Sequence, residues 1–154
     1  MSLVEEDSIE NAESSLDTFK ENDILFGAMR TYFHKVLIAP FDGITRKTCF
    51  ILSPKDETYR WFGYMLLYQN STIDYSSVVS VGSTMPYVRW KDLARMNIFI
   101  PPKNIITDFN KIIEPIIHRI KENYFLNLNL AKQRDALLPR LMSGKMSLEG
   151  KEIV

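Results

Sequence analysis

Basic side chains alternate with aromatic or hydroxyl side chains in three short stretches of the chain. In proteins that bind duplex DNA, lysine and arginine contact phosphates, while hydroxyl and guanidinium groups also reach base edges. The combination therefore predicts a DNA-facing surface, with the basic members on phosphates and Ser, Thr and Tyr, or one Arg, on base edges. The predicted DNA-facing residues are Arg30, Tyr32, Lys35, Arg46, Lys47, Ser83, Thr84, Tyr87 and Arg89.

The same residues have a plainer interpretation as scattered charges on an ordinary surface. Charged residues make up 25% of the chain, which is typical of globular domains. Tyr32 and Tyr87 are equally suited to core or rim positions, and Gly82 could simply make a turn. The pattern alone therefore leaves both interpretations open.

Residues that could catalyse a reaction do not converge in the sequence. The two histidines are His34 and His118, and His118 has Glu114 and Glu122 at a spacing of four on either side. That spacing favours an exposed, ion-paired helix face over a metal site. Cys49 lies in an apolar run and is predicted to be a small buried core residue. We therefore expect no catalytic residue, no metal ligand and no cofactor site in this chain.

The charge balance hides an asymmetry. The chain has 19 basic and 19 acidic residues, but six of the acids lie in residues 1–19, which contain no Lys or Arg. Residues 20–154 therefore hold 19 basic residues against 13 acidic ones. A mildly basic body behind an acidic leader is compatible with a polyanionic partner.

Short apolar runs rich in β-branched and aromatic residues predict a small sheet. Glycine and proline separate these runs, as expected for turns between strands. A further run, ended by Pro101-Pro102, is also predicted to be a strand. The predicted strands are residues 23–26, 35–39, 48–52 and 97–100.

Between residues 57 and 70 the apolar spacing changes to three and four, which is typical of an amphipathic helix. Asp56 is suited to cap the first turn of this helix. Residues 72–79 predict a second short helix, and residues 90–94 predict one helical turn. Together these elements predict an α+β fold, with a small mixed or antiparallel sheet and flanking helices.

Residues 105–142 predict a long, projecting α-helix. Apolar residues recur there at alternating steps of four and three, as in a heptad repeat. Pro115 suits the first turn of the long helix, with a shorter helix before it, and Ser143-Gly144 is expected to end it. So long a helix cannot bury its stripe on a small domain, so we expect the stripe to bind another subunit. The predicted interface residues are Ile113, Ile117, Ile120, Tyr124, Asn127, Leu138 and Leu141.

Apolar runs in the chain are only a few residues long, far short of the ~20 residues that span a bilayer. The N-terminus has no signal-peptide pattern. The single cysteine excludes an intrachain disulfide and fits a reducing compartment. We therefore expect a cytoplasmic protein with no membrane partner.

Several strings, taken in order, resemble the target-recognition domain in specificity subunits of type I restriction-modification systems. Residues 23–36, DILFGAMRTYFHKV, resemble a motif that the family commonly writes G-D-I-L-F-G-K-hydrophobic-R-P-Y-hydrophobic-x-K, and residues 39–43 continue it. Three later strings resemble the end of that domain, at residues 82–86, 90–93 and 98–102. Residues 134–144, RDALLPRLMSG, resemble the close of the family's conserved helical region.

This resemblance implies a non-catalytic, prokaryotic subunit that recognises double-stranded DNA. In the family, two target-recognition domains each read half of a bipartite site, and two long helices separate the domains and dock the modification subunits. The modification subunits bind S-adenosylmethionine and methylate adenine, while the restriction subunits hydrolyse ATP and cleave DNA. The resemblance thus implies S-adenosylmethionine, ATP and Mg²⁺ on partner subunits only.

This chain departs from the family pattern at three positions and in length. Asn22, Ala28 and Thr31 stand where Gly, Lys and Pro are usual, and the missing lysine implies one phosphate contact fewer. The chain is under half the usual length and has one helical region. It could be an expressed fragment, a truncated gene product, or a half-subunit that forms a homodimer through its long helix.

The predicted organisation has four parts. They are an acidic, weakly ordered leader (1–19), a partial DNA target-recognition domain (20–102), a long helical conserved region (103–146) and a tail (147–154). Two other functions stay open at this point. One is a helical adaptor that binds only protein, and the other is an enzyme whose pocket gathers His34 with two carboxylates.

Overall fold

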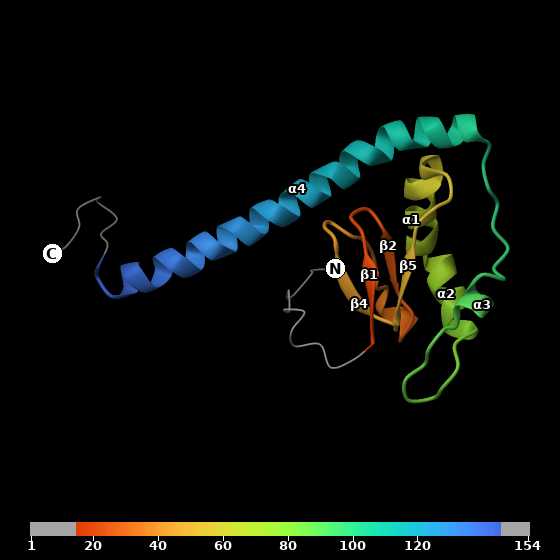
Figure 1. The fold of residues 1–154 in the computed structure, drawn as a ribbon, viewed down its shortest axis with the longest axis horizontal. Coiled ribbons are helices and arrows are strands. Elements are labelled where there is room, and N and C mark those ends of the chain that lie inside the picture. The colour runs from red at the N-terminus through yellow and green to blue at the C-terminus, as the bar shows by residue number, and fades with distance from the viewer. Residues whose placement is uncertain (1–14, 146–154) are drawn as a thin grey trace. The chain divides into compact units, whose positions relative to one another are not determined.

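The computed structural model describes residues 15–145 (Figure 1). The chain forms two compact units, residues 1–112 and residues 113–154. The first unit contains all the strands of the described part together with short helices, and a long helix runs on into the second. The predicted α+β fold with a small antiparallel sheet and a long C-terminal helix is confirmed.

Five short strands form two antiparallel sheets in the first unit. They are β1 (Leu16–Phe19), β2 (Ile24–Gly27), β3 (Val36–Ile38), β4 (Gly43–Arg46) and β5 (Cys49–Leu52). One sheet pairs β1 with β4, and the other has the order β3-β2-β5. The strands predicted at residues 23–26, 35–39 and 48–52 correspond to β2, β3 and β5.

β1 lies in the segment that the sequence assigned to a weakly ordered leader. Its register pairs Leu16 with Arg46 and Phe19 with Gly43. The Phe19 ring covers Gly43 so closely that a Cβ atom there would lie 2.6 Å from Phe19 Cζ. Leucine and phenylalanine at the two ends of β1 contribute to this pairing with β4, a strand that lies far from β1 in the sequence. The prediction of weak order is therefore wrong for residues 16–19, and residues 1–14 of the expected leader lie outside the described residues.

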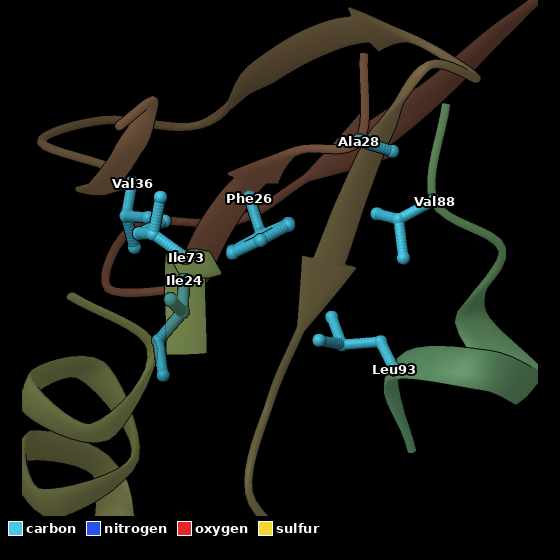
Figure 2. Packing of buried hydrophobic residues seen from close by; sticks show 7 residues of the cluster. All are labelled: Ile24, Phe26, Ala28, Val36, Ile73, Val88 and Leu93. Carbon is cyan, nitrogen blue, oxygen red and sulfur yellow. The ribbon is translucent and has the colours of Figure 1, made fainter. Parts of the chain in front are cut away.

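The core forms around the central strand β2. Ile24 and Phe26 are 3% and 1% exposed, and the Phe26 ring stacks on the Phe50 ring of β5 with centroids 6.2 Å apart. A continuous apolar run suits a strand whose two faces are both covered. Figure 2 shows the buried cluster, which consists of Ile24, Phe26, Ala28, Val36, Ile73, Val88 and Leu93.

The predicted short helices are confirmed. They are α1 (Arg60–Tyr68), preceded by a single 3-10 turn η3 (Glu57–Tyr59), then α2 (Asn70–Val78) and α3 (Trp90–Leu93). Asp56 caps η3, because its carboxylate accepts the Thr58 N–H at 3.0 Å. Half-buried side chains of α1 and α2 pack against the core cluster.

The strand predicted at residues 97–100 is wrong. These residues have no regular secondary structure, and Ile98, Phe99 and Ile100 are 44%, 79% and 59% exposed. A β-prone sequence becomes a strand only when a neighbouring strand accepts its hydrogen bonds, and no described strand pairs with this segment.

The long helix α4 (Lys103–Met142) is continuous, so the prediction of a shorter helix before Pro115 is wrong. An interior proline removes one backbone donor and crowds the preceding turn, but α4 continues through Pro115, and its first turns are held within the first unit by other contacts. Ile106 is 1% exposed, and Asn110 Nδ2 donates to the Thr58 carbonyl at 2.7 Å. Gly144, with φ 72°, follows the helix end, as predicted.

Among residues 15–145, no helix is both long enough and apolar enough to cross a membrane.

Candidate nucleic-acid interface

The three basic stretches predicted from the sequence adjoin at the end of the sheet where β2 finishes. Ala28, the first residue after β2, donates its N–H to the Thr48 carbonyl and accepts the Val88 N–H, both at 2.9 Å. Met29 then forms an isolated antiparallel bridge with Tyr87. Segments far apart in sequence are thus joined through their backbones. We call the surface formed by residues 28–35, 46–48 and 81–89 the basic end.

Residues 28–35 form a firmly held turn. Arg30 and His34 both have left-handed backbones, with φ 51° and 56°, and they flank the 3-10 turn η2 (Thr31–Phe33). Thr31 is 2% exposed, and its Oγ1 lies 3.1 Å from Ser77 Oγ in α2. The buried threonine fixes the turn to the helix layer beneath it.

Arg30 is partly enclosed by the protein. Its N–H donates to the Pro86 carbonyl at 2.8 Å, which ties the turn to the loop before Tyr87. Its Nε is buried and has no hydrogen-bond partner within residues 15–145. A phosphate contact by Arg30 would therefore use its terminal guanidinium nitrogens.

Tyr32 and Lys35 are exposed at the surface of the turn. Tyr32 is 53% exposed, and Lys35 Nζ lies 5.3 Å above the centre of the Phe33 ring. Gly27 makes the approach of Lys35 possible, because a Cβ at Gly27 would lie 2.8 Å from Lys35 Cβ. In the sequence, Gly27 served only as a separator between apolar runs, since no spacing pattern reports how closely two strands approach.

Arg46 and Lys47 lie at the turn between β4 and β5, and both are exposed. Lys47 lines an open groove with Asp17, Cys49 and Trp90. Cys49 is half-buried at this groove, so it is less enclosed than the sequence predicted. Burial still raises the pKa of its thiol, although hydrogen bonds with Thr45 and Phe26 oppose the shift, so the thiol is a weak nucleophile at neutral pH.

Residues 81–89 contribute a loop and a bridge. Ser83 and Thr84 are exposed. Gly82 has φ 102°, so it has the role in the turn that the plainer interpretation gave it. Tyr87 is half-buried and packs against the core cluster, which gives it a structural role whether or not it touches a ligand. Arg89 is exposed, but its Nε pairs with Asp92 Oδ2 at 2.6 Å. A ligand phosphate would have to compete with Asp92 for Arg89.

His34 serves the fold of this surface. Its Nε2 donates to the Tyr68 carbonyl, and its ring lies 4.5 Å from the Tyr68 ring, centre to centre. No group of three or more His, Cys, Asp or Glu side chains within residues 15–145 is placed to hold a metal ion. The arrangement at the basic end is therefore suited to binding a polyanion through cations and exposed rings.

Two exposed aromatic residues, one in the basic end and one directly after it, were not predicted from the sequence to be surface residues. Phe33 is 56% exposed beside Tyr32, and Trp90 is 49% exposed with its ring edge-on to Phe50, 5.7 Å between centroids. Aromatic residues next to apolar runs are usually predicted to be core, and nothing in their spacing signals exposure.

The predicted interface stripe lies on α4, and all its residues belong to the second unit. Ile117 is 5% exposed, whereas Ile120 and Leu138 are 58% and 52% exposed. On the same helix, Ile113, Tyr124 and Leu141 are half-buried and Asn127 is exposed. His118 Nε2 lies 3.3 Å from Glu122 Oε1, and Arg119 Nη1 lies 3.2 Å from Glu122 Oε2, so the expected ion-paired face is confirmed by the Arg119–Glu122 pair.

Comparison with known proteins gives a consistent match. Residues 7–137 match the family described as type I restriction modification DNA specificity domain. Over 68 residues, 44% of this chain, the sequence is 37% identical to the type I restriction enzyme MjaIX specificity subunit of Methanocaldococcus jannaschii. Over 94 residues, 60% of this chain, it is 32% identical to the HindI specificity subunit of Haemophilus influenzae.

A third relative is the EcoDI specificity subunit of Escherichia coli, 29% identical over 89 residues, 58% of this chain. The aligned parts span 16% of the MjaIX subunit and 20% of each of the other two. The chain thus corresponds to a limited part of these longer proteins.

Proposed function

The chain belongs to the family of type I restriction-modification DNA specificity domains, and from this premise we propose that its first unit binds double-stranded DNA through the basic end. The bound sequence would be one half of a bipartite site. The chain itself would carry out no chemical step. The alternative of a helical adaptor without DNA binding is not favoured by the relatives, which are specificity subunits.

The observation that carries this proposal is the convergence of three separate basic stretches. Backbone hydrogen bonds from Ala28 to Thr48 and from Val88 to Ala28 join the stretches at one end of the sheet. Five cations are gathered there, although Asp92 pairs with Arg89 and Asp17 lines the groove beside Lys47. Clustered cations on loops fixed by a rigid sheet suit a phosphate backbone. The cations are Arg30, Lys35, Arg46, Lys47 and Arg89.

The second part of the proposal concerns protein partners. Exposed Ile120, Leu130 and Leu138 on α4 would pair with another long helix, either from the longer protein or from a second copy of this chain, and would help dock modification subunits. S-adenosylmethionine, ATP and Mg²⁺ would then be bound by partner subunits, and restriction subunits would join indirectly. A complex that acts on prokaryotic DNA would work in the cytoplasm.

The DNA-binding proposal is tested by salt dependence. Full-length chain is titrated into a fluorescein-labelled 40-base-pair duplex of mixed sequence, and anisotropy is recorded from 50 to 200 mM NaCl. Wild type should lose affinity steeply as salt rises, because bound cations release counterions. Lys35→Ala and Lys47→Ala should each weaken binding and lower the salt slope by about one.

Lys55→Ala is the matched control. Lys55 is exposed and follows the opposite end of β5, away from the basic end. Equal losses for Lys55→Ala and Lys47→Ala, or no binding by wild type at 50 mM NaCl, would contradict the proposal.

The helix proposal is tested by sedimentation velocity. Replacing Ile120 and Leu138 with aspartate should convert any wild-type oligomer to monomer and abolish capture of a co-expressed modification subunit. Asp substitutions at exposed Lys132 and Gln133, on the same helix, provide the control. An unchanged oligomer and unchanged capture in the Ile120/Leu138 variant would show that the stripe is not the interface.

A further inference from the structure

We infer that the exposed ring pair Tyr32–Phe33 contacts bases of the DNA, with Phe33 on a thymine methyl group in the major groove, and so determines sequence preference rather than overall affinity. This inference rests on the proposed DNA binding of the basic end. It starts from two rings that the rest of the surface leaves uncovered, 53% and 56% exposed, with centroids 4.8 Å apart.

The backbone that presents the two rings is strained. Arg30 before the turn and His34 after it both have φ between 50° and 60°, and neither is glycine. Left-handed conformations disfavour residues with a Cβ, and such conformations persist where the surrounding structure enforces them. Two left-handed residues, one on each side of a three-residue turn, hold Tyr32 and Phe33 at the surface. Burial of both rings would otherwise favour the folded state.

Contacts from three directions fix this turn. Thr31 Oγ1 meets Ser77 Oγ at 3.1 Å, and His34 Nε2 donates to the Tyr68 carbonyl at the end of α1. The Arg30 N–H donates to the Pro86 carbonyl at 2.8 Å. The aromatic side chains therefore sit on a preorganised support, which lowers the entropy lost when they bind a ligand.

The charge around the rings favours DNA as the occupant. Lys35 Nζ lies 5.3 Å above the Phe33 ring, and Lys47 belongs to the neighbouring hairpin turn. In DNA each base is flanked by backbone phosphates. A ring with cations beside it can therefore contact the base while the cations contact the phosphates. Apolar side chains read the thymine methyl group, which is exposed in the major groove and differs from cytosine at the same place.

The test begins with selection. Full-length wild type is used to select from a duplex library with 20 randomised base pairs, and the enriched duplex is resynthesised with uracil in place of each thymine in turn. Uracil lacks only the methyl group. At one position, uracil should weaken wild-type binding about three- to fivefold, the effect of losing one buried methyl group.

Phe33→Ala should make that position indifferent to uracil and should relax selection there. Phe33→Leu keeps an apolar side chain and should keep part of the discrimination. Phe99→Ala is the matched control, because Phe99 is 79% exposed but lies outside the basic end. Thermal unfolding of each variant shows that its fold is intact.

The outcomes separate the two proposals. Absence of any DNA binding by wild type overturns the proposed function. Normal wild-type selection with a Phe33→Ala variant that still discriminates thymine from uracil overturns this inference alone. An equal loss of affinity for every sequence in Phe33→Ala also overturns it, since that result assigns the ring to the phosphate surface or to the fold.

Discussion

Apolar side chains are distributed in opposite ways in the two units of the chain. In the first unit Phe26, Val36 and Val88 are 0–2% exposed, around a central strand with both faces covered (Figure 2). In the second unit Ile120, Leu130 and Leu138, on one helix, are 50–58% exposed. The first unit thus has a buried core of its own, whereas many large apolar side chains of α4 in the second unit are exposed.

This difference indicates where each unit obtains its stability. Burial of apolar surface is the main favourable term in folding, so the first unit is stabilised by its own core. A single helix in water is stabilised chiefly by packing an amphipathic face against something else. The second unit should therefore gain most of its stability from a partner, whereas the first should present the same basic end with or without one.

The largest expected change in the free energy of unfolding comes from a substitution in the core of the first unit. Phe26→Ala should destabilise the first unit by about 3–5 kcal/mol, because it leaves a cavity beside Phe50. Leu130→Ala is the matched change in the second unit and should shift unfolding by no more than about 0.5 kcal/mol, because Leu130 is half-exposed. Urea unfolding followed by tryptophan fluorescence reports how each variant affects the first unit, which holds Trp61 and Trp90.

An equal loss for the two variants would show that the units unfold together and that the contrast is wrong. Leu130→Ala should instead show its effect in sedimentation velocity, as weaker association.

A smaller effect is expected where the core meets the basic end. Gly27→Ala should destabilise the first unit by about 1–3 kcal/mol, because the new Cβ would lie 2.8 Å from Lys35 Cβ. It should also shift Lys35 and so weaken DNA binding. Gly63→Ala is the control, because its Cβ would only reach ordinary contact, 3.6 Å from Ile24 Cδ1.

Alanine at Gly63, inside α1, should be neutral or stabilise by about 0.5–1 kcal/mol. Thermal unfolding and DNA anisotropy give the two readouts. Unchanged stability in Gly27→Ala would mean that β3 can move away from β2, and that the basic end is less rigid than its backbone bonds indicate.

The smallest effect concerns the attachment of the first turns of α4 to the first unit. Lys103 Nζ lies 2.9 Å from Asp56 Oδ2, and this hydrogen bond, with others from Thr58, lowers the pKa of Asp56 to about 2. Since the folded pKa is below the ordinary value of 3.8, the contribution to stability is present above about pH 4 and is lost as the pH falls through about 2.

Asp56→Asn should therefore lower the thermal midpoint at pH 5 by at most about 2 °C, since the pair is exposed, and should match wild type near pH 2. Asparagine can still accept the Thr58 N–H, so the variant isolates the charge. Lys103→Gln should give the same pH profile. A difference that persists at pH 2 would assign the effect to the cap instead of the ion pair.

Local signals in the sequence were sufficient for the elements that depend on neighbours in the chain. Apolar runs predicted β2, β3 and β5, and Asp56 was recognised as a cap from its type and place. Residues 97–100 failed because a strand requires a partner strand, which their own sequence does not supply. β1 and β4 were missed because their half-exposed, four-residue pattern carries too little periodicity.

Sequence alone determined the family of this chain, its α+β class and the presence of an apolar stripe on a long helix. The family follows from the resemblance of ordered strings to known motifs, whereas the fold class and the stripe follow from residue types at short spacing, where local physics is strong. Only the tertiary structure decided that residues 28–35, 46–48 and 81–89 meet at the basic end, through the bonds that join Ala28 to Thr48 and Val88. It also decided that Phe33 is exposed, because exposure depends on which distant segments cover a side chain.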